Sequence, residues 1–269
     1  MLRSPAVAGQ FYPANPQELA NLVRRFTQQS SQKKKQRVKA CLVPHAGYVY
    51  SGSVAGAVLA RIEIPQKVIV LGVRHFPRGE NAAILSEGSW KTPLKDAPID
   101  VQLAQKCKDE CALLKEDALA HAQEHSLEVQ LPFLQILAPE FRFVPIALGT
   151  IQFEELQKIG EAIARAISSF REETLLLTTS DMNHYEDDAT TRKKDAKAVA
   201  QLEAMDPGGL YDTCRKESIS MCGLGPAVAM LFALRALGAT RPETVQYATS
   251  ATVSGDYRRV VGYAGMIFD

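Results

Sequence analysis

A chain of 269 residues with 46% hydrophobic and 23% charged residues has the composition of a globular protein with a large core, which excludes a disordered chain. Its 31 Lys and Arg residues nearly balance its 30 Asp and Glu residues, so we expect no nucleic-acid partner. No apolar stretch reaches the roughly 20 residues that cross a bilayer, so we expect no membrane partner. The five cysteines are an odd number without a disulfide framework, which favours the cytoplasm.

The N-terminal part of the chain predicts one helix and one loop. Asn15, Pro16 and Glu18 form an N-cap, a first-turn proline and a capping-box partner. The apolar residues that follow lie at helical spacing on one face: Leu19, Leu22, Val23 and Phe26. Residues 30–37, with three consecutive lysines, are typical of a solvated loop.

Strands and helices then alternate along the chain. Residues 38–44, 67–73 and 174–180 are rich in β-branched residues and leucine, as expected of parallel strands buried on both faces. Helical spacing predicts helices over residues 53–61, 101–114 and 153–170. Three further strands are predicted over residues 142–148, 245–254 and 260–268, and the last two should pair antiparallel. The order predicts one α/β domain over residues 1–269, with a mostly parallel mixed sheet flanked by helices.

Histidines follow the predicted parallel strands. The first strand leads into His45, the second into His75, and the third into Asp181 and His184. Ligands of open α/β sheets bind at the carboxyl ends of the strands, so these side chains should lie close together. Neutral imidazole is a good donor to Fe, Cu and Zn, and this pattern therefore predicts a metal site. On residue type alone, the third ligand is Asp181, His184 or Cys222.

The case for Cys222 rests on its position before an apolar helix over residues 227–237. Pro226 suits the first turn of that helix, so Cys222 should lie near the positive end of the helix dipole. That position is expected to lower the pKa of the thiol and favour the metal-binding thiolate. The competing interpretation is a small buried hydrophobic residue, which is the expected role of the other four cysteines.

A second metal motif competes with the first. His121, Glu124 and His125 match H-x-x-E-H, in which both histidines of one helix hold zinc and the glutamate acts as a base. Pro132 limits the length of helix that is available to carry this motif. A zinc hydrolase is therefore the less favoured alternative.

Five segments spread over the chain resemble the Memo family, whose microbial members are also called AmmeMemoRadiSam system protein B. They are residues 5–13 (PAVAGQFYP), 43–48 (VPHAGY), 124–133 (EHSLEVQLPF), 180–184 (SDMNH) and 262–265 (GYAG). The resemblance implies the fold of the LigB-like class III extradiol dioxygenases, which use non-haem Fe(II). It implies metal ligands at His45, His75 and Cys222, and it implies that Asp181, His184 and His125 line the same pocket as candidate catalytic residues.

One segment departs from the family pattern. The family usually has G-P-S-H-H after the second strand, whereas this chain has Gly72, Val73, Arg74, His75 and Phe76. The first histidine of the pair is kept and the second is replaced by Phe76. Arg74 is expected to bring a permanent positive charge near the pocket, which would affect the metal and favour an anionic substrate.

Two classes of function follow from the resemblance. The first is a redox enzyme with dioxygenase-like activity, in which Fe(II) or Cu is the expected metal and Zn is an alternative. The second is a binding or adaptor protein that retains the pocket without turnover, because fold alone does not determine function. We expect a small-molecule or peptide ligand, and a homo-oligomer is compatible with the sequence.

Overall fold

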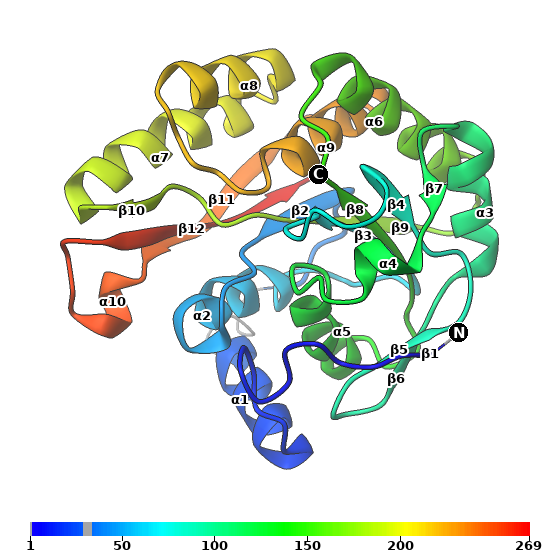
Figure 1. Ribbon diagram of the computed structural model, residues 1–269, viewed down its shortest axis with the longest axis horizontal. Coiled ribbons are helices and arrows are strands. Elements are labelled where there is room, and N and C mark those ends of the chain that lie inside the picture. The colour runs from blue at the N-terminus through cyan, green and yellow to red at the C-terminus, as the bar shows by residue number, and fades with distance from the viewer. Residues whose placement is uncertain (1, 29–33) are drawn as a thin grey trace.

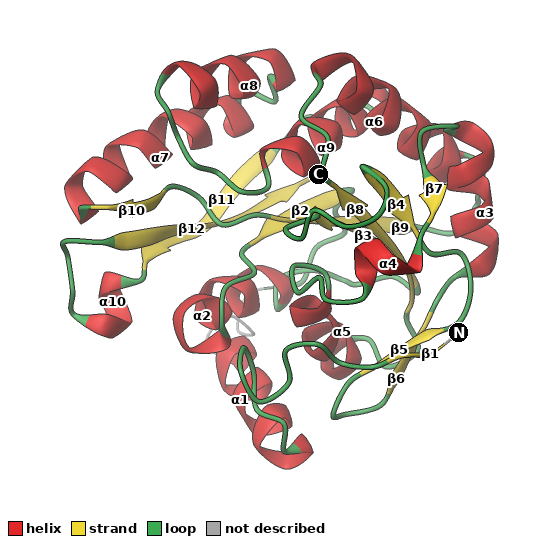
Figure 2. Cartoon of the chain, viewed as in Figure 1, coloured by secondary structure: helices red, strands yellow, loops and turns green. Residues whose placement is uncertain are grey.

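The computed structural model describes residues 2–28 and 34–269, and it shows an α/β fold around one large mixed sheet (Figures 1 and 2). Four strands at the centre of this sheet run parallel, with β9 between β2 and β3, and β8 beyond β3. They are β2 (Ala40–Val43), β9 (Thr174–Thr179), β3 (Lys67–Val73) and β8 (Arg142–Leu148). Their residues are almost all buried, as continuous runs of Val, Ile and Leu require in a sheet covered on both faces.

Antiparallel strands extend both edges of this parallel centre. On one side β12 pairs with β2, β10 and β11, and on the other side β4 pairs antiparallel with β8 and parallel with β7. The bounds are β12 (Val260–Phe268), β11 (Pro242–Thr249), β10 (His184–Glu186), β4 (Ala82–Ile84) and β7 (Lys115–Glu116). The expected fold class, a mixed sheet with a parallel centre, is confirmed.

Two layers of helices cover the sheet (Figure 1). One layer consists of α2 (Tyr48–Leu59), which packs on β12, β11 and β2, together with α1 (Pro16–Gln28) and α5 (Leu131–Leu137). The other layer is built on α9 (Leu224–Ala236), with α6 (Phe153–Ser168), α7 (Asp188–Glu203) and α8 (Pro207–Lys216) around it, and α3 (Val101–Glu110) packs on α6. Both α2 and α9 are apolar over most of their surface, because each lies between the sheet and another helix.

The remaining elements are short. A three-stranded sheet joins β1 (Leu2–Arg3), β5 (Ser89–Lys91) and β6 (Asp96–Pro98). The short helices are α4 (Ala118–His121), η1 (Glu128–Gln130) and α10 (Ala251–Ser254). Within the described ranges, no helix has the length and apolar character needed to cross a membrane.

Several predicted boundaries were wrong. The helix expected over residues 53–61 begins earlier, at Tyr48, and the one expected over 101–114 ends at Glu110, because Cys111 is extended. The strand expected over 245–254 ends at Thr249, and the residues after it form α10. The helices α7 and α8 were not predicted. In the expected loop over 30–37, residues 30–33, and with them Lys33, lie outside the described residues, and the rest contains neither helix nor strand.

Close packing between α2 and β12 gives the first prediction. A Cβ atom on Gly265 would lie 2.6 Å from Cγ2 of Val58 and 2.9 Å from Cγ1 of Val54. We therefore expect Gly265→Ala to lower the free energy of unfolding by about 1–3 kcal/mol, measured by urea denaturation, because added volume strains a packed core. Gly208→Ala is the matched control, because its Cβ would meet no atom closer than 3.6 Å. Equal stability of the two variants would contradict this packing.

Candidate metal centre

All six residues predicted for the site line one cavity of about 330 Å³ at the carboxyl end of the parallel strands. They are His45, His75, His125, Asp181, His184 and Cys222. Phe11, Tyr185 and Val261 form apolar parts of the wall. The structure thus brings together residues that are up to 177 positions apart in the sequence.

His45 follows directly on β2 and is buried. Its Nδ1 lies 2.9 Å from Oγ1 of Thr179, and its Nε2 lies 3.2 Å from Sγ of Cys222. Burial, with a smaller effect from His75, lowers the pKa of His45 to about 3. The ring is therefore neutral at physiological pH, the form that binds a metal.

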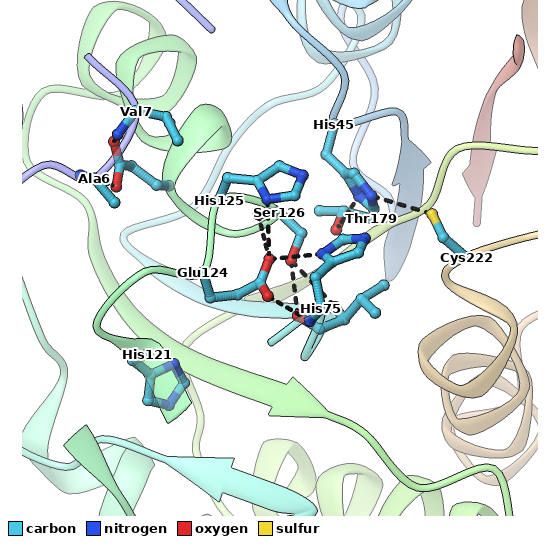
Figure 3. A network of polar contacts seen from close by, with 12 residues as sticks. Ala6, Val7, His45, His75, His121, Glu124, His125, Ser126, Thr179 and Cys222 are labelled. Carbon is cyan, nitrogen blue, oxygen red and sulfur yellow. Dashed lines mark hydrogen bonds and ion pairs between the residues drawn. The ribbon is translucent and has the colours of Figure 1, made fainter. Parts of the chain in front are cut away.

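His75 follows β3 and is oriented by Glu124 (Figure 3). The carboxylate of Glu124 accepts hydrogen bonds from the backbone N–H of His75 at 2.6 Å and from its Nδ1 at 2.9 Å. Burial acts to raise the pKa of Glu124, but the hydrogen bond and charge of His75 outweigh it and lower that pKa to about 2. Because Nδ1 carries the proton, Nε2 is the donor atom of His75, as in carboxylate-oriented metal ligands.

His125 lies closer to His45 and His75 than the sequence indicated. One ring nitrogen each from His45, His75 and His125 lies within 4.8 Å of the other two. The His125 ring stacks on that of His75, with centroids 4.5 Å apart, and burial lowers the pKa of His125 to about 4. The only signal for this in the sequence was its place in the E-H-S-L-E segment.

Cys222 lies two residues before α9, and Gly223 is the N-cap of that helix. Its Sγ accepts a hydrogen bond from the backbone N–H of Asp181 at 3.3 Å. The predicted lowering of the thiol pKa is wrong, because burial, with a contribution from the charge of Asp181, raises the pKa of Cys222 instead. The thiol form is therefore favoured at neutral pH, and the positive charge of a cation would shift this position toward the thiolate.

Asp181 and His184 lie on the wall next to Cys222. The Oδ1 atom of Asp181 accepts hydrogen bonds from the backbone N–H groups of His45 and Ala46. The carboxylate thus fixes the loop after β2. The ring of His184 contacts the backbone of Ser220 on one side and the cavity on the other.

Two expectations about the segment after β3 need correction. The guanidinium of Arg74 donates to the carbonyl of Gly79 and to Oδ1 of Asn81, so it is held by a surface loop and does not line the cavity. Arg74 was expected to place a positive charge near the pocket, and its guanidinium instead contributes nothing to the cavity wall. Phe76, which replaces the second histidine of the family pattern, is 40% exposed and also lies outside the cavity lining.

The H-x-x-E-H interpretation is contradicted. The helix α4 ends at His121, so His121 and His125 do not lie on one helix face. Figure 3 shows the His121 ring directed away from the other histidines, and it packs against Trp90 with ring centroids 5.6 Å apart. Glu124 orients His75 and is therefore not available as the base of a zinc site with His121.

The N-terminal segment closes one side of the cavity through Glu128. This fully buried carboxylate accepts hydrogen bonds from Nη1 of Arg3, from the hydroxyl of Tyr12 and from two backbone N–H groups in between. Phe11 is thereby placed against His125, with ring centroids 4.7 Å apart. The sequence analysis did not find this anchor, because only the repeated glutamate of the E-H-S-L-E segment hints at it.

Comparisons with known proteins agree with the geometry. The family model of Memo-like proteins matches residues 3–267. The chain belongs to the Memo family. A MEMO1 family protein of Methanopyrus kandleri is 39% identical over 280 residues, covering 100% of this chain and 99% of that protein. One of Aquifex aeolicus is 40% identical over 268 residues, covering 99% of each chain.

A solved structure shares the fold of this Memo family chain. It is an uncharacterized protein from Escherichia coli K12, with a TM-score of 0.55 and 13% sequence identity. The match covers 86% of this chain and 100% of that chain. At this level of identity the likeness supports the fold alone.

The second prediction tests the role of His121 in this Memo family chain. Its ring is fully buried, neither ring nitrogen has a hydrogen-bond partner within the described residues, and burial lowers the pKa of His121 to about 4. In the unfolded chain the imidazole takes up a proton near pH 6.5, whereas in the folded chain it stays neutral down to about pH 4. His121 therefore lowers the free energy of unfolding as pH falls from about 6.5 to 4. We expect His121→Leu to reduce the pH slope of the unfolding free energy by up to about 1.4 kcal/mol per pH unit in that range.

Urea denaturation of the metal-free protein between pH 8 and pH 5 measures this slope. Above pH 7.5 the slopes of the two proteins should agree, which is the internal control, because His121 is then neutral in both states. Metal content of His121→Leu should equal that of the unaltered protein. An unchanged slope, or loss of metal, would show that His121 is not the isolated buried residue seen in this structure.

Proposed function

We propose that this chain holds one transition-metal ion through His45, His75 and Cys222 and uses it for redox chemistry with O2. The observation that carries the proposal is the convergence of two oriented imidazoles and a thiol at one end of a cavity, with Nε2 of His45 3.2 Å from Sγ of Cys222. Fe(II) or Cu suits two imidazoles and a thiolate, and Zn is the alternative. Fe(II) or Cu(I), when bound, would supply electrons for the reduction of O2, whereas Zn(II) has no redox chemistry and would act only as a Lewis acid.

The environment of the donor atoms fits a metal. Each ligand histidine is fixed through its Nδ1, His45 by Thr179 and His75 by Glu124, which leaves both Nε2 atoms as donors. Partial burial makes the thiol of Cys222 a poor ion by itself, whereas a cation would stabilise its thiolate. His125 completes the wall between the N-terminal segment and His75, and we assign it to substrate contact.

His184 and Asp181 have separate roles in this proposal. His184 lines the cavity without being held by the other histidines, so it is available to accept or donate a proton. Asp181 holds the backbone of His45 and Ala46 and so keeps the first ligand in place. We assign the proton transfer to His184 and a positioning role to Asp181.

The third prediction concerns the sulfur ligand. We expect a sulfur-to-metal charge-transfer band in the spectrum of Cu-loaded or Fe-loaded protein, because a thiolate is a strong and soft donor. Cys222→Ser should remove the band and lower metal content several-fold. Cys111→Ser is the matched control, because Cys111 is a free cysteine that lies at the end of α3, outside the cavity lining.

The histidine cluster provides the competing ligand set. If His125 is the third ligand, His125→Ala will lose metal and Cys222→Ser will keep both its metal and its spectrum. That result would replace the sulfur ligand by a three-histidine site.

The fourth prediction separates an enzyme from a binding protein. Anaerobically purified, Fe(II)-loaded protein should consume O2 in the presence of a reductant, and His184→Ala should lower the rate about 10²–10⁴-fold while keeping its metal, because general acid–base groups contribute that range. An oxygen electrode and elemental analysis measure the two quantities. A metal-loaded protein that consumes no O2 with Fe or Cu would instead favour the binding or adaptor function.

A further inference from the structure

The orientation of His184 is determined by a backbone carbonyl. Its Nδ1 lies 2.9 Å from the carbonyl oxygen of Ser220. A carbonyl oxygen accepts hydrogen bonds and cannot donate them, so Nδ1 must carry the proton. In the neutral ring, Nε2 then has a free lone pair, and it has no hydrogen-bond partner among residues 2–28 and 34–269.

Ser220 is itself fixed by the side chain of Asn183. The Oδ1 atom of Asn183 accepts hydrogen bonds from the backbone N–H of Ser220 at 3.1 Å and from its hydroxyl at 3.2 Å. The hydroxyl oxygen of Ser220 in turn accepts the backbone N–H of His184 at 2.8 Å. Asn183, His184 and Ser220 thus form a closed ring of hydrogen bonds, which we name the His184 clamp.

The clamp is anchored in the protein interior. The backbone N–H of Asn183 donates to Oδ1 of Asp195 at 2.9 Å, and Oδ2 of the same carboxylate accepts the hydroxyl of Tyr247 at 2.6 Å. Asp195 is fully buried. The side-chain amide of Asn183 donates to Glu186 at 2.6 Å. Networks in which every polar member is paired are rigid, because the loss of one bond leaves a buried group unpaired.

Backbone strain next to His184 is consistent with a fixed orientation. Tyr185 has a φ angle of 65°, which is unfavourable for a residue other than glycine, and the ladder between β10 and β12 shifts register between His184 and Glu186. Such a bulge redirects the side chain before it. Strain of this kind persists only where the surroundings enforce it. The hydrogen bonds of Asn183 and Ser220 on either side supply that enforcement.

We propose that Asn183 and Ser220 are positioning residues that hold His184 as the Nδ1–H tautomer, so that Nε2 accepts a proton from a ligand bound in the cavity. In that step the N–H or O–H bond of the ligand breaks, a bond from the proton to Nε2 forms, and the positive charge is stabilised by the Ser220 carbonyl on the opposite side of the ring. The proton returns to the departing product. This inference rests on the proposed function only in taking the cavity as the reaction site.

The tautomer of His184 can be measured directly, without an activity assay. Protein labelled with 15N is examined by long-range 15N–1H NMR of the imidazole groups at pH 8, both metal-free and loaded with diamagnetic Zn(II). We expect His184 to show a protonated Nδ1 and an unprotonated Nε2. A protonated Nε2, or an equal mixture of tautomers, would overturn the proposal.

Ser220→Ala removes the hydroxyl that links His184 to Asn183, and we expect the two nitrogen shifts of His184 to move toward each other as the single tautomer is lost. Ser220→Thr keeps a hydroxyl and should restore the pattern. Ser168→Ala, at the exposed end of α6, is the matched control and should leave the pattern unchanged. An unchanged His184 spectrum in Ser220→Ala would show that the clamp only supports the fold.

Oxygen consumption separates this inference from the proposed function. If the Fe(II)-loaded protein turns over, Ser220→Ala should lower the rate about tenfold or more, with metal content within twofold of the unaltered protein. If the protein shows the expected tautomer but consumes no O2, the result supports the clamp and contradicts the redox function. If the protein consumes O2 but His184 is the other tautomer, the result supports the redox function and contradicts the clamp.

Discussion

The buried carboxylate of Glu124 is the interaction on which the arrangement of the site depends. It accepts hydrogen bonds from the backbone and Nδ1 of His75 and from the backbone N–H of Ser126, and it lies 3.6 Å from Nδ1 of His125. A buried charge is tolerated only when its hydrogen-bonding capacity is met, so the end of β3 and the segment around residue 125 must come together. Two histidines from distant parts of the chain are thereby fixed beside the third.

A second consequence concerns competition between protons and metal ions. Burial lowers the pKa of both His45 and His125 below the physiological range, so these imidazoles are in the donor form before any ion arrives. The thiol of Cys222 behaves in the opposite way, because burial raises its pKa and so favours the protonated form. The imidazoles of His45 and His125 therefore need to lose no proton to bind a cation at neutral pH, whereas the sulfur of Cys222 does.

The central strands and the site residues that follow them could be predicted from the sequence for a clear physical reason. Strands β3 and β8 were predicted to the residue, because strands buried on both faces are continuous apolar runs with sharp polar ends. The rule that parallel strands end at one edge then placed His45, His75 and Asp181 together. The helix α7 was missed, because its buried positions include Thr191 and Asp195 and it has no apolar stripe.

Other parts of the site left no local pattern to find. The approach of His125 to His75, the clamp between Asn183 and Ser220 and the anchoring of the N-terminal segment all depend on contacts between residues far apart in the chain. The sequence also misjudged Cys222, because the helix dipole favours a thiolate while burial, which cannot be seen from spacing, opposes it more strongly. The resemblance to a family supplied the ligand assignment that spacing alone left open.

The anchor on Glu128 also affects the order in which this protein can fold. Arg3 and Tyr12 leave the ribosome more than 100 residues before their partner, which is 125 positions from Arg3. Until Glu128 is made, the first dozen residues have no buried acceptor, and closing so long a loop carries an entropic cost that only later contacts offset. Cys222 is made later still, so the cavity wall is completed only after the partner of the N-terminal segment has been made. A nascent chain that ends before Cys222 therefore lacks one of the three proposed ligands, and the anchor on Glu128 can form before the proposed site is complete.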